Sequence, residues 1–344
     1  MPVSPKFLFT VLLIASPLGE FDILRFIPVH FLKSIFPVFL LIFVLCGGAA
    51  PPPPQRVQNR PASQESTPLT ALQIEVNRLM ANKAGSVVVM DVASGRILAQ
   101  RHLDLAGQRL EPPGSTVKPF VLMELLSSGK INAEQRVMCR RPLYIGGKRM
   151  DCSHPASITT LDARDAVAYS CNTYFSTVAT RLDPTQLAEM YRRTGFTSPT
   201  GHTSGEISGR ISTAKEPYQL QLQALGEWGI EVTPLELLAA YQNLARQKLK
   251  GDSENPGSAA PVFDGLERAV KYGVAHAAQP AGTTAAGKTG TASGVKTPQS
   301  HGFFVGYAPA DKPQIVVLVY LEHGRGMDAA AVAGTVITAW WKSR

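Results

Sequence analysis

The sequence is poor in cysteine and lacks a recognisable zinc-ligand spacing. Its 344 residues include four cysteines, Cys46, Cys139, Cys152 and Cys171, none of which forms a Cys-x-x-Cys pair. The histidines are dispersed and form no ladder of ligand spacings. We therefore expect neither a metal ion nor a cofactor.

A concentrated basic region is also missing. The formal net charge is +8, but Lys and Arg are scattered singly or in short pairs such as Arg192-Arg193. No basic stripe alternates with aromatic residues, as nucleic-acid-binding surfaces often do. A modest positive excess equally suits proximity to anionic lipids or to an acidic cell wall. We expect no nucleic-acid partner.

No apolar run reaches the roughly 20 residues that an unassisted spanning helix needs. Two shorter runs, 7–18 and 35–46, are separated by the charged stretch 20–25. The second run follows Lys33 and ends in the small residues 47–50, which is typical of an export signal or signal anchor. We expect residues 1–50 to direct export and to contact the cytoplasmic membrane, as a cleaved signal, as a retained anchor or through lipidation at Cys46.

The remaining chain divides into a linker and one large domain. Residues 51–67 begin with four prolines and are rich in Pro, Gln and Ser, as linkers are. Residues 68–344 have the composition of a globular domain. After export, this domain would lie in the periplasm or on the extracytoplasmic face of the membrane.

Hydrophobic patterning predicts an α+β fold. Residues 86–91 and 97–101 flank an Ala-Ser-Gly turn and indicate a β-hairpin. Strands at both ends of the domain, with helices between them, predict one central antiparallel sheet covered by helices. The expected helices are 115–129, 161–168, 184–193, 234–245, 265–276 and 329–341, and the expected late strands are 288–291, 303–307 and 314–321.

Export changes how two of the cysteines are interpreted. Cys139 and Cys152 flank the segment 142–149, whose Gly146-Gly147 pair is typical of a hairpin turn. In an oxidising compartment such a hairpin could bring the two sulfurs together. Two interpretations stay open, a Cys139–Cys152 disulfide or two packed free thiols.

Three short elements carry chemistry when taken together. The first follows the turn 111–114, which places Ser115 at a helix N-terminus, where negative charge is favoured. A serine hydroxyl is a poor nucleophile, and a neutral lysine amine with its pKa depressed by burial and a second cation can take its proton. The elements are Ser115-Thr116-Val117-Lys118, Ser170-Cys171-Asn172 and Lys288-Thr289-Gly290-Thr291.

From about residue 86 to the C-terminus the chain resembles the transpeptidase domain of class B penicillin-binding proteins. The resemblance rests on the three elements and on the segments 113–120, 170–175, 233–235, 287–292 and 304–309. It implies that Ser115 is the nucleophile and Lys118 the general base. Ser170 and Asn172 would form the second catalytic element, with Lys288 also catalytic, and Thr289, Gly290 and Thr291 would bind substrate.

The resemblance implies a peptidoglycan DD-transpeptidase that acylates Ser115 with D-Ala-D-Ala stem peptides and is inhibited by β-lactams. DD-carboxypeptidase, β-lactamase and a sensor that binds muropeptide or β-lactam without turnover are the alternatives. Two departures from the family are expected to matter. Only 51–82 is available for a pedestal, and Gly226-Glu227-Trp228 stands where the family usually has Gly-Gln-Gly.

Overall fold

The computed structural model describes residues 70–251, 259–293 and 300–344. The predicted export segment, 1–50, and the predicted linker, 51–67, lie outside these residues. Within the described ranges, no helix has both the length and the apolar character needed to cross a bilayer.

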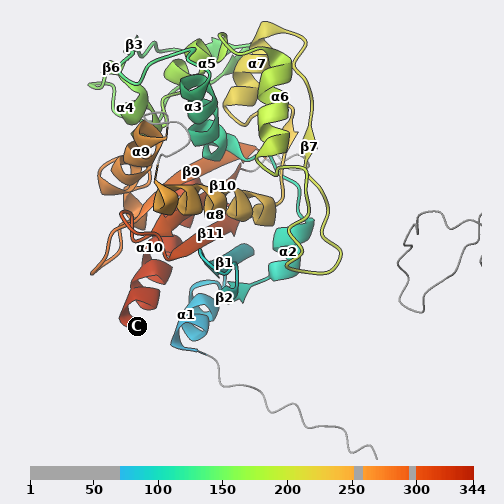
Figure 1. Cartoon of the computed structure of the whole chain (residues 1–344), viewed down its shortest axis with the longest axis vertical. Coiled ribbons are helices and arrows are strands. Elements are labelled where there is room, and N and C mark those ends of the chain that lie inside the picture. The colour runs from blue at the N-terminus through green and yellow to red at the C-terminus, as the bar shows by residue number, and fades with distance from the viewer. Residues whose placement is uncertain (1–69, 252–258, 294–299) are drawn as a thin grey trace, which may run out of the picture. The chain divides into compact units, whose positions relative to one another are not determined.

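A five-stranded antiparallel sheet forms the centre of the domain (Figure 1). Its strand order is β2-β1-β11-β10-β9, so the early hairpin joins the last strands of the chain. Gly85 of β1 lies opposite Leu321 of β11, and Asp91 lies opposite Ile315. The predicted α+β fold, with a central antiparallel sheet closed by both ends of the domain, is confirmed. The strands are β1 (Gly85–Asp91), β2 (Ile97–Arg101), β9 (Ala286–Ser293), β10 (Ser300–Ala308) and β11 (Ile315–Leu321).

Alternate side chains of the sheet enter two apolar cores, as the two-residue period of a strand requires. Val87 and Val89 of β1 belong to a core with α1 (Ala71–Leu79) and α10 (Gly326–Lys342). Val88 belongs to a larger core on the opposite face. Both faces are therefore covered, which explains why β11 is buried throughout.

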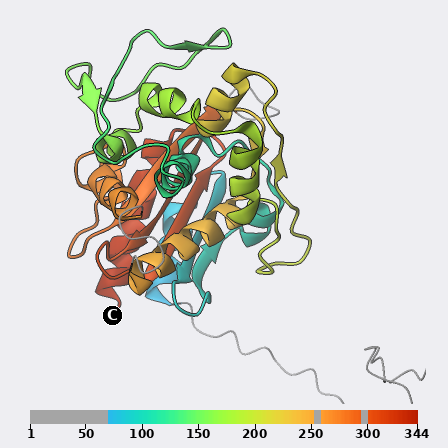
Figure 2. The same ribbon diagram turned by 45° about the horizontal axis from the view of Figure 1, so that its top comes forward.

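The larger core contains α3 (Lys118–Ser127) and α8 (Pro234–Lys250). Helix α8 crosses the sheet face in Figures 1 and 2. The other described helices and short strands are α2 (Leu103–Gln108), α4 (Ala163–Ala168), α5 (Asn172–Ala179), α6 (Pro184–Arg193), α7 (Pro217–Ala224), α9 (Ala260–Lys271), β3 (Val137–Met138), β4 (Tyr144–Ile145), β5 (Lys148–Arg149), β6 (Thr160–Leu161), β7 (Arg210–Ile211) and β8 (Ile230–Glu231).

Several predicted element boundaries were wrong. The helix expected from Ser115 begins as a 3-10 turn, η2 (Gly114–Val117), and α3 starts only at Lys118. Leu161 was predicted to be helical but pairs with Val137 in a short ladder, and the Asp162 side chain caps α4. Helix α9 starts five residues earlier than expected because Pro261 is suited to a first helical turn.

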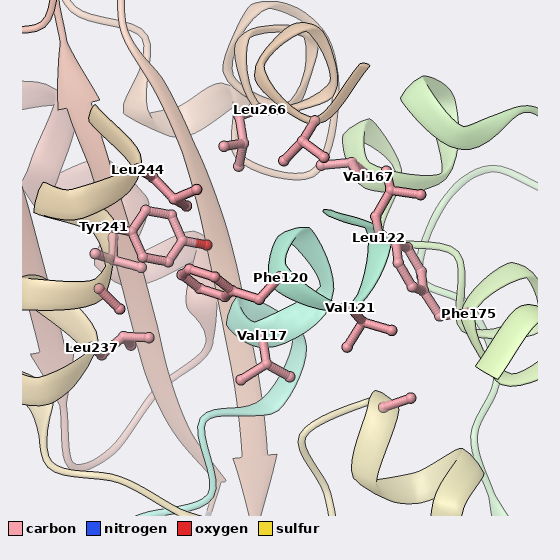
Figure 3. Packing of buried hydrophobic residues seen from close by; sticks show 14 of the residues in the cluster. Val117, Phe120, Val121, Leu122, Val167, Phe175, Leu237, Tyr241, Leu244 and Leu266 are labelled. Atoms are coloured by element: carbon pink, nitrogen blue, oxygen red, sulfur yellow. The ribbon is translucent and has the colours of Figure 1, made fainter. Parts of the chain in front are cut away.

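Helix α3 is held in the middle of the larger core (Figure 3). The Phe120 ring contacts the rings of Tyr241 and Phe196 edge-on, each at a centroid distance of 5.4 Å. The Tyr241 hydroxyl donates a hydrogen bond of 2.8 Å to the Thr116 carbonyl oxygen. Aromatic packing and this buried hydrogen bond fix the turn that precedes α3.

Candidate active site

The Ser115 turn lies against two other segments. Gly114 has a φ of +53°, and its N–H donates to the Gly226 carbonyl oxygen at 3.0 Å. A Cβ atom on Gly114 would lie 3.0 Å from the Thr291 carbonyl oxygen. Glycine is required here by both the left-handed backbone and the close approach of β9. The turn that carries the first element thus contacts the third element directly.

Ser115 itself is half-buried, and its neighbours are firmly held. The ring Nε2 of His301, on β10, lies 2.8 Å from the Pro112 carbonyl oxygen. Ser115 Oγ makes no hydrogen bond to a side chain or backbone group among the described residues. The hydroxyl is therefore presented on a rigid turn without a protein partner in those parts of the chain.

Lys118, the first residue of α3, is fully buried. Its Nζ donates to the carbonyl oxygen of Ser170 at 2.9 Å, to Ser170 Oγ at 3.2 Å and to Asn172 Oδ1 at 2.6 Å. Burial lowers the pKa of Lys118 to about 8, although the negative charges of Cys152, Cys171 and Glu227 act in the opposite direction. A useful fraction of this amine is neutral near pH 7.

Ser170 lies between two lysine amines. Lys288 Nζ donates to Ser170 Oγ at 2.8 Å and to the Thr289 carbonyl oxygen at 3.1 Å. Lys288 is also fully buried, and burial first, then the charge of Lys118, lower its pKa well below the usual lysine value. One hydroxyl therefore connects two buried amines that are costly to charge together.

The backbone of Ser170 has a φ of +54°, which is uncommon for a residue with a side chain. Cys171 follows as the N-cap of α5, and its sulfur accepts a hydrogen bond from the Tyr174 N–H. The turn between α4 and α5 therefore directs Ser170 Oγ back towards Lys118. Such a conformation is disfavoured locally and is maintained by its tertiary contacts.

The amide side chain of Asn172 is engaged at both ends. Its Oδ1 accepts from Lys118, and its Nδ2 donates to the Met150 carbonyl oxygen at 2.9 Å. Nδ2 also donates to the Asp151 carbonyl oxygen at a longer distance of 3.4 Å. Asn172 thus orients Lys118 and also fastens the segment around Met150 to the site.

The third element lies on β9, which is an edge strand of the sheet. A Cβ atom on Gly290 would lie 2.5 Å from the Pro113 carbonyl oxygen, so the strand can approach the Ser115 turn only with glycine there. Thr291 is exposed, and its Oγ1 accepts a hydrogen bond of 2.9 Å from the Gly326 N–H. Edge strands present unpaired backbone groups to an extended peptide.

Glu227 follows Gly226, whose carbonyl oxygen contacts the Ser115 turn, and it forms an ion pair. Its Oε2 lies 2.8 Å from Lys148 Nζ, which belongs to the β4–β5 hairpin. Trp228, the next residue, is partly buried and packs against the larger core. The departure from the usual Gly-Gln-Gly sequence therefore combines core packing with a charged contact to the hairpin.

The cysteines lie closer together than the sequence indicated. Cys139 and Cys152 are free thiols with their sulfurs 3.5 Å apart, and a disulfide between them stays a prediction. Cys171 and His154 join them, and the four donor atoms lie within 4.8 Å of one another. Sequence reasoning missed this set because its members, spread over 139–171, include no Cys-x-x-Cys pair. The spacing Cys152-Ser153-His154 was the one available signal.

Comparison with known proteins adds family information to this geometry. The family model for the penicillin binding protein transpeptidase domain matches residues 85–340. A probable peptidoglycan D,D-transpeptidase, PenA of Neisseria gonorrhoeae, is 25% identical over 295 residues, covering 73% of this chain and 50% of that protein. The peptidoglycan D,D-transpeptidase MrdA of Acinetobacter baumannii is 24% identical over 356 residues, with coverage of 79% and 53%. The chain thus spans about half the length of these relatives.

Solved structures share the fold. Pseudomonas aeruginosa PBP2 in complex with WCK 5153 superimposes with a TM-score of 0.68 and 24% identity, covering 78% of this chain and 76% of that one. The D,D-transpeptidase domain of a peptidoglycan glycosyltransferase from Eggerthella lenta gives a TM-score of 0.69 and 23% identity, with coverage of 80% and 81%. The arrangement of sheet and helices is therefore that of known transpeptidase domains.

Proposed function

Because the chain belongs to the penicillin-binding protein transpeptidase family, we propose that it is a serine-type peptidoglycan D,D-transpeptidase that acts on D-Ala-D-Ala stem peptides. The observation that carries this proposal is the Ser170 hydroxyl held between the buried amines of Lys118 and Lys288. Lysines are rarely buried without a partner, and a depressed amine pKa is what a lysine base for serine activation requires.

In the acylation step, Ser115 Oγ attacks the carbonyl carbon of the penultimate D-Ala and transfers its proton to neutral Lys118. The tetrahedral intermediate then collapses, the peptide C–N bond breaks, and the terminal D-Ala leaves as a neutral amine after receiving a proton. Ser170, in contact with both lysines, relays that proton. The result is an ester on Ser115 that an acceptor amine attacks in the second step.

Lys288 takes a different role from Lys118. The carboxylate of an incoming substrate would favour the charged form of a nearby amine. If that amine is Lys288, its charge in turn favours the neutral form of Lys118, because the two share Ser170. Thr289, Gly290 and Thr291 would align the peptide along the edge strand β9.

The backbone N–H groups of Ser115 and Thr291 are the proposed oxyanion donors. The close contact of Gly114 with Thr291 supports this pairing, since it brings the two backbones to the same place. Loss of one such donor typically costs about 3 kcal/mol in transition-state stabilisation. These two N–H groups would supply fixed dipoles where the oxyanion charge develops.

The alternatives to transpeptidation differ in what happens to the ester on Ser115. In a DD-carboxypeptidase or a β-lactamase water attacks this ester, whereas in a sensor the ester persists. A hydrolytic base would need a free carboxylate near the ester, and Glu227 is instead paired with Lys148. This contact holds the Glu227 carboxylate at the β4–β5 hairpin, which supports transpeptidation over hydrolysis by this residue. We further propose that residues 1–50 export the domain and hold it at the extracytoplasmic face of the membrane, where stem peptides and β-lactams are encountered.

A fluorescent penicillin tests the proposed nucleophile. Wild-type protein should be labelled covalently, and Ser115→Ala should lose labelling, because only the Oγ is removed. Ser127→Ala, at the end of helix α3, which follows the Ser115 turn, is the matched control and should label normally. Equal labelling of the Ser115→Ala variant would contradict the proposal. For the proposed topology, a protease added to spheroplasts should degrade the domain, whereas full protection would contradict export.

A further inference from the structure

A compact group of sulfur and nitrogen donors lies behind the second catalytic element. Cys139, Cys152 and His154 come from the segment around the β4–β5 hairpin, and Cys171 lies between Ser170 and Asn172. All four donor atoms lie within 4.8 Å of one another. Within the described ranges, this group brings together every cysteine.

Three of the six donor separations are close to the edges of a small tetrahedron, and the others lie within 4.8 Å. Zn–S bonds of about 2.3 Å and Zn–N bonds of about 2.0–2.1 Å place tetrahedral ligands roughly 3.8 Å (S to S) and roughly 3.5 Å (S to N) apart. Cys139 Sγ lies 3.5 Å from Cys152 Sγ and 3.5 Å from His154 Nε2. Cys152 Sγ lies 3.7 Å from Cys171 Sγ. A metal ion would need only small movements of these side chains.

Backbone donors already point at two of the sulfurs. The Asn172 N–H donates to Cys152 Sγ at 3.2 Å, and the Tyr174 N–H donates to Cys171 Sγ at 3.4 Å. N–H donors of this kind stabilise the negative charge of a thiolate and orient it towards a metal. The N-terminus of α5 therefore favours the charged form that metal binding requires.

The His154 ring presents one of its nitrogens to the sulfurs. His154 Nε2 faces the sulfurs, while Nδ1 lies 3.0 Å from the Pro155 carbonyl oxygen, so an Nδ1–H tautomer would have an acceptor. Arg141 Nη2 lies 2.8 Å from Nδ1, and it also donates to the His154 carbonyl oxygen at 2.6 Å. A guanidinium can only donate, so this contact makes Nδ1 an acceptor, and metal binding through Nε2 would require Arg141 to move off Nδ1 while keeping its bond to the His154 carbonyl oxygen. The Pro155 carbonyl oxygen would then be the outer partner that metal-binding histidines usually have.

We propose that Cys139, Cys152, His154 and Cys171 bind one Zn²⁺ ion in a closed, structural site. Three sulfurs with one imidazole are a soft donor set typical of structural zinc, and Cys152, His154 and Cys171 are buried. Binding releases the thiol protons and forms three Zn–S bonds and one Zn–N bond, with no change of oxidation state.

The ion would help to hold the proposed catalytic groups in position. Cys171 is covalently joined to Ser170 and Asn172, which contact Lys118. A metal bridge would tie this turn to the segment around Cys139 and Cys152, which also supports Asn172 through the Met150 carbonyl oxygen. The unfavourable backbone of Ser170 would then be fixed from one side by the metal and from the other by the lysines.

The test uses the full chain, purified in detergent under reducing conditions and stripped of metal by a chelator. Addition of Zn²⁺ should give one bound ion per chain by elemental analysis. Addition of Co²⁺ should give the intense near-ultraviolet sulfur-to-cobalt bands and the visible bands of tetrahedral thiolate coordination. His154→Ala should lower metal affinity at least tenfold, whereas His276→Ala, which removes an exposed histidine, should not.

A conservative variant separates loss of a ligand from loss of the fold. His154→Cys should retain Zn²⁺ with four sulfur ligands and shift the cobalt spectrum, which a merely structural defect would not produce. Three results would overturn the proposal: no stoichiometric Zn²⁺ uptake by the reduced protein, a cobalt spectrum without thiolate bands, or equal metal affinity in wild type and His154→Ala. The metal readouts do not depend on acylation, so they remain informative even if the proposed activity is absent.

Discussion

The pH dependence of acylation follows from the burial of Lys118. The neutral amine is the proposed base, and burial lowers the pKa of Lys118 to about 8. The neutral fraction would rise from about 1% at pH 6 to about 50% at pH 8, from the ordinary titration relation. The second-order acylation rate should therefore rise roughly 50-fold across these two pH units, with a slope near one in log rate against pH.

Stopped-flow acylation by a chromogenic or fluorescent β-lactam measures this profile. Lys118→Ala should be slower by about 10²- to 10⁴-fold, as expected for loss of a general base, and should lose the slope. Lys312→Ala, at an exposed lysine, is the control and should keep both rate and slope. A wild-type rate that changes less than about threefold between pH 6 and pH 8 would refute the assignment of Lys118 as a base titrating in this range.

Three substitutions test the supports of the site. Ser170→Ala removes the hydroxyl shared by Lys118 and Lys288 and should lower the acylation rate at least tenfold while labelling still occurs at Ser115; an unchanged rate would contradict the proton relay. Gly290→Ala places a Cβ 2.5 Å from a backbone oxygen and should lower the unfolding free energy, measured by thermal or urea unfolding, by about 1–3 kcal/mol. An unchanged unfolding free energy would mean that β9 can move away from the Ser115 turn. Phe120→Ala leaves a cavity beside its two aromatic partners and should cost about 3–5 kcal/mol, and a loss below about 1 kcal/mol would mean that the core collapses around the site.

Much of the fold was predictable because local patterning and tertiary structure agree. The β1–β2 hairpin was predicted from apolar or alternating runs, the three late strands were also predicted, and α6 begins where Asp183 and Pro184 predict. Helix α8 continues to Lys250, beyond the predicted end at Ala245, because good helix formers follow without a stop signal until Gly251. Periodicity detected these elements but located several of their ends poorly, and it missed the helices α1, α2, α5 and α7.

The candidate site was also predictable only in part. The three sequence elements predicted which residues to examine, since each has a recognisable spacing. The contact of Lys118 with Ser170, 52 positions away, depends on how α3 packs against α5 and could not be derived from either segment alone. The group around Cys171 escaped prediction for the same reason, because its donors meet only after the hairpin between Cys139 and Cys152 folds onto α5.

Intact-mass spectrometry after mixing with benzylpenicillin tests the central claim most directly. We predict a single penicilloyl adduct that maps to Ser115 and persists for many minutes to hours at neutral pH, because the Glu227 carboxylate is engaged by Lys148. Ser115→Ala should show no adduct, and nitrocefin hydrolysis should not exceed one equivalent of wild-type protein. An adduct on another residue, or no adduct on folded wild-type protein, would contradict the account of Ser115 as the nucleophile, and rapid multiple turnover would contradict the transpeptidase assignment.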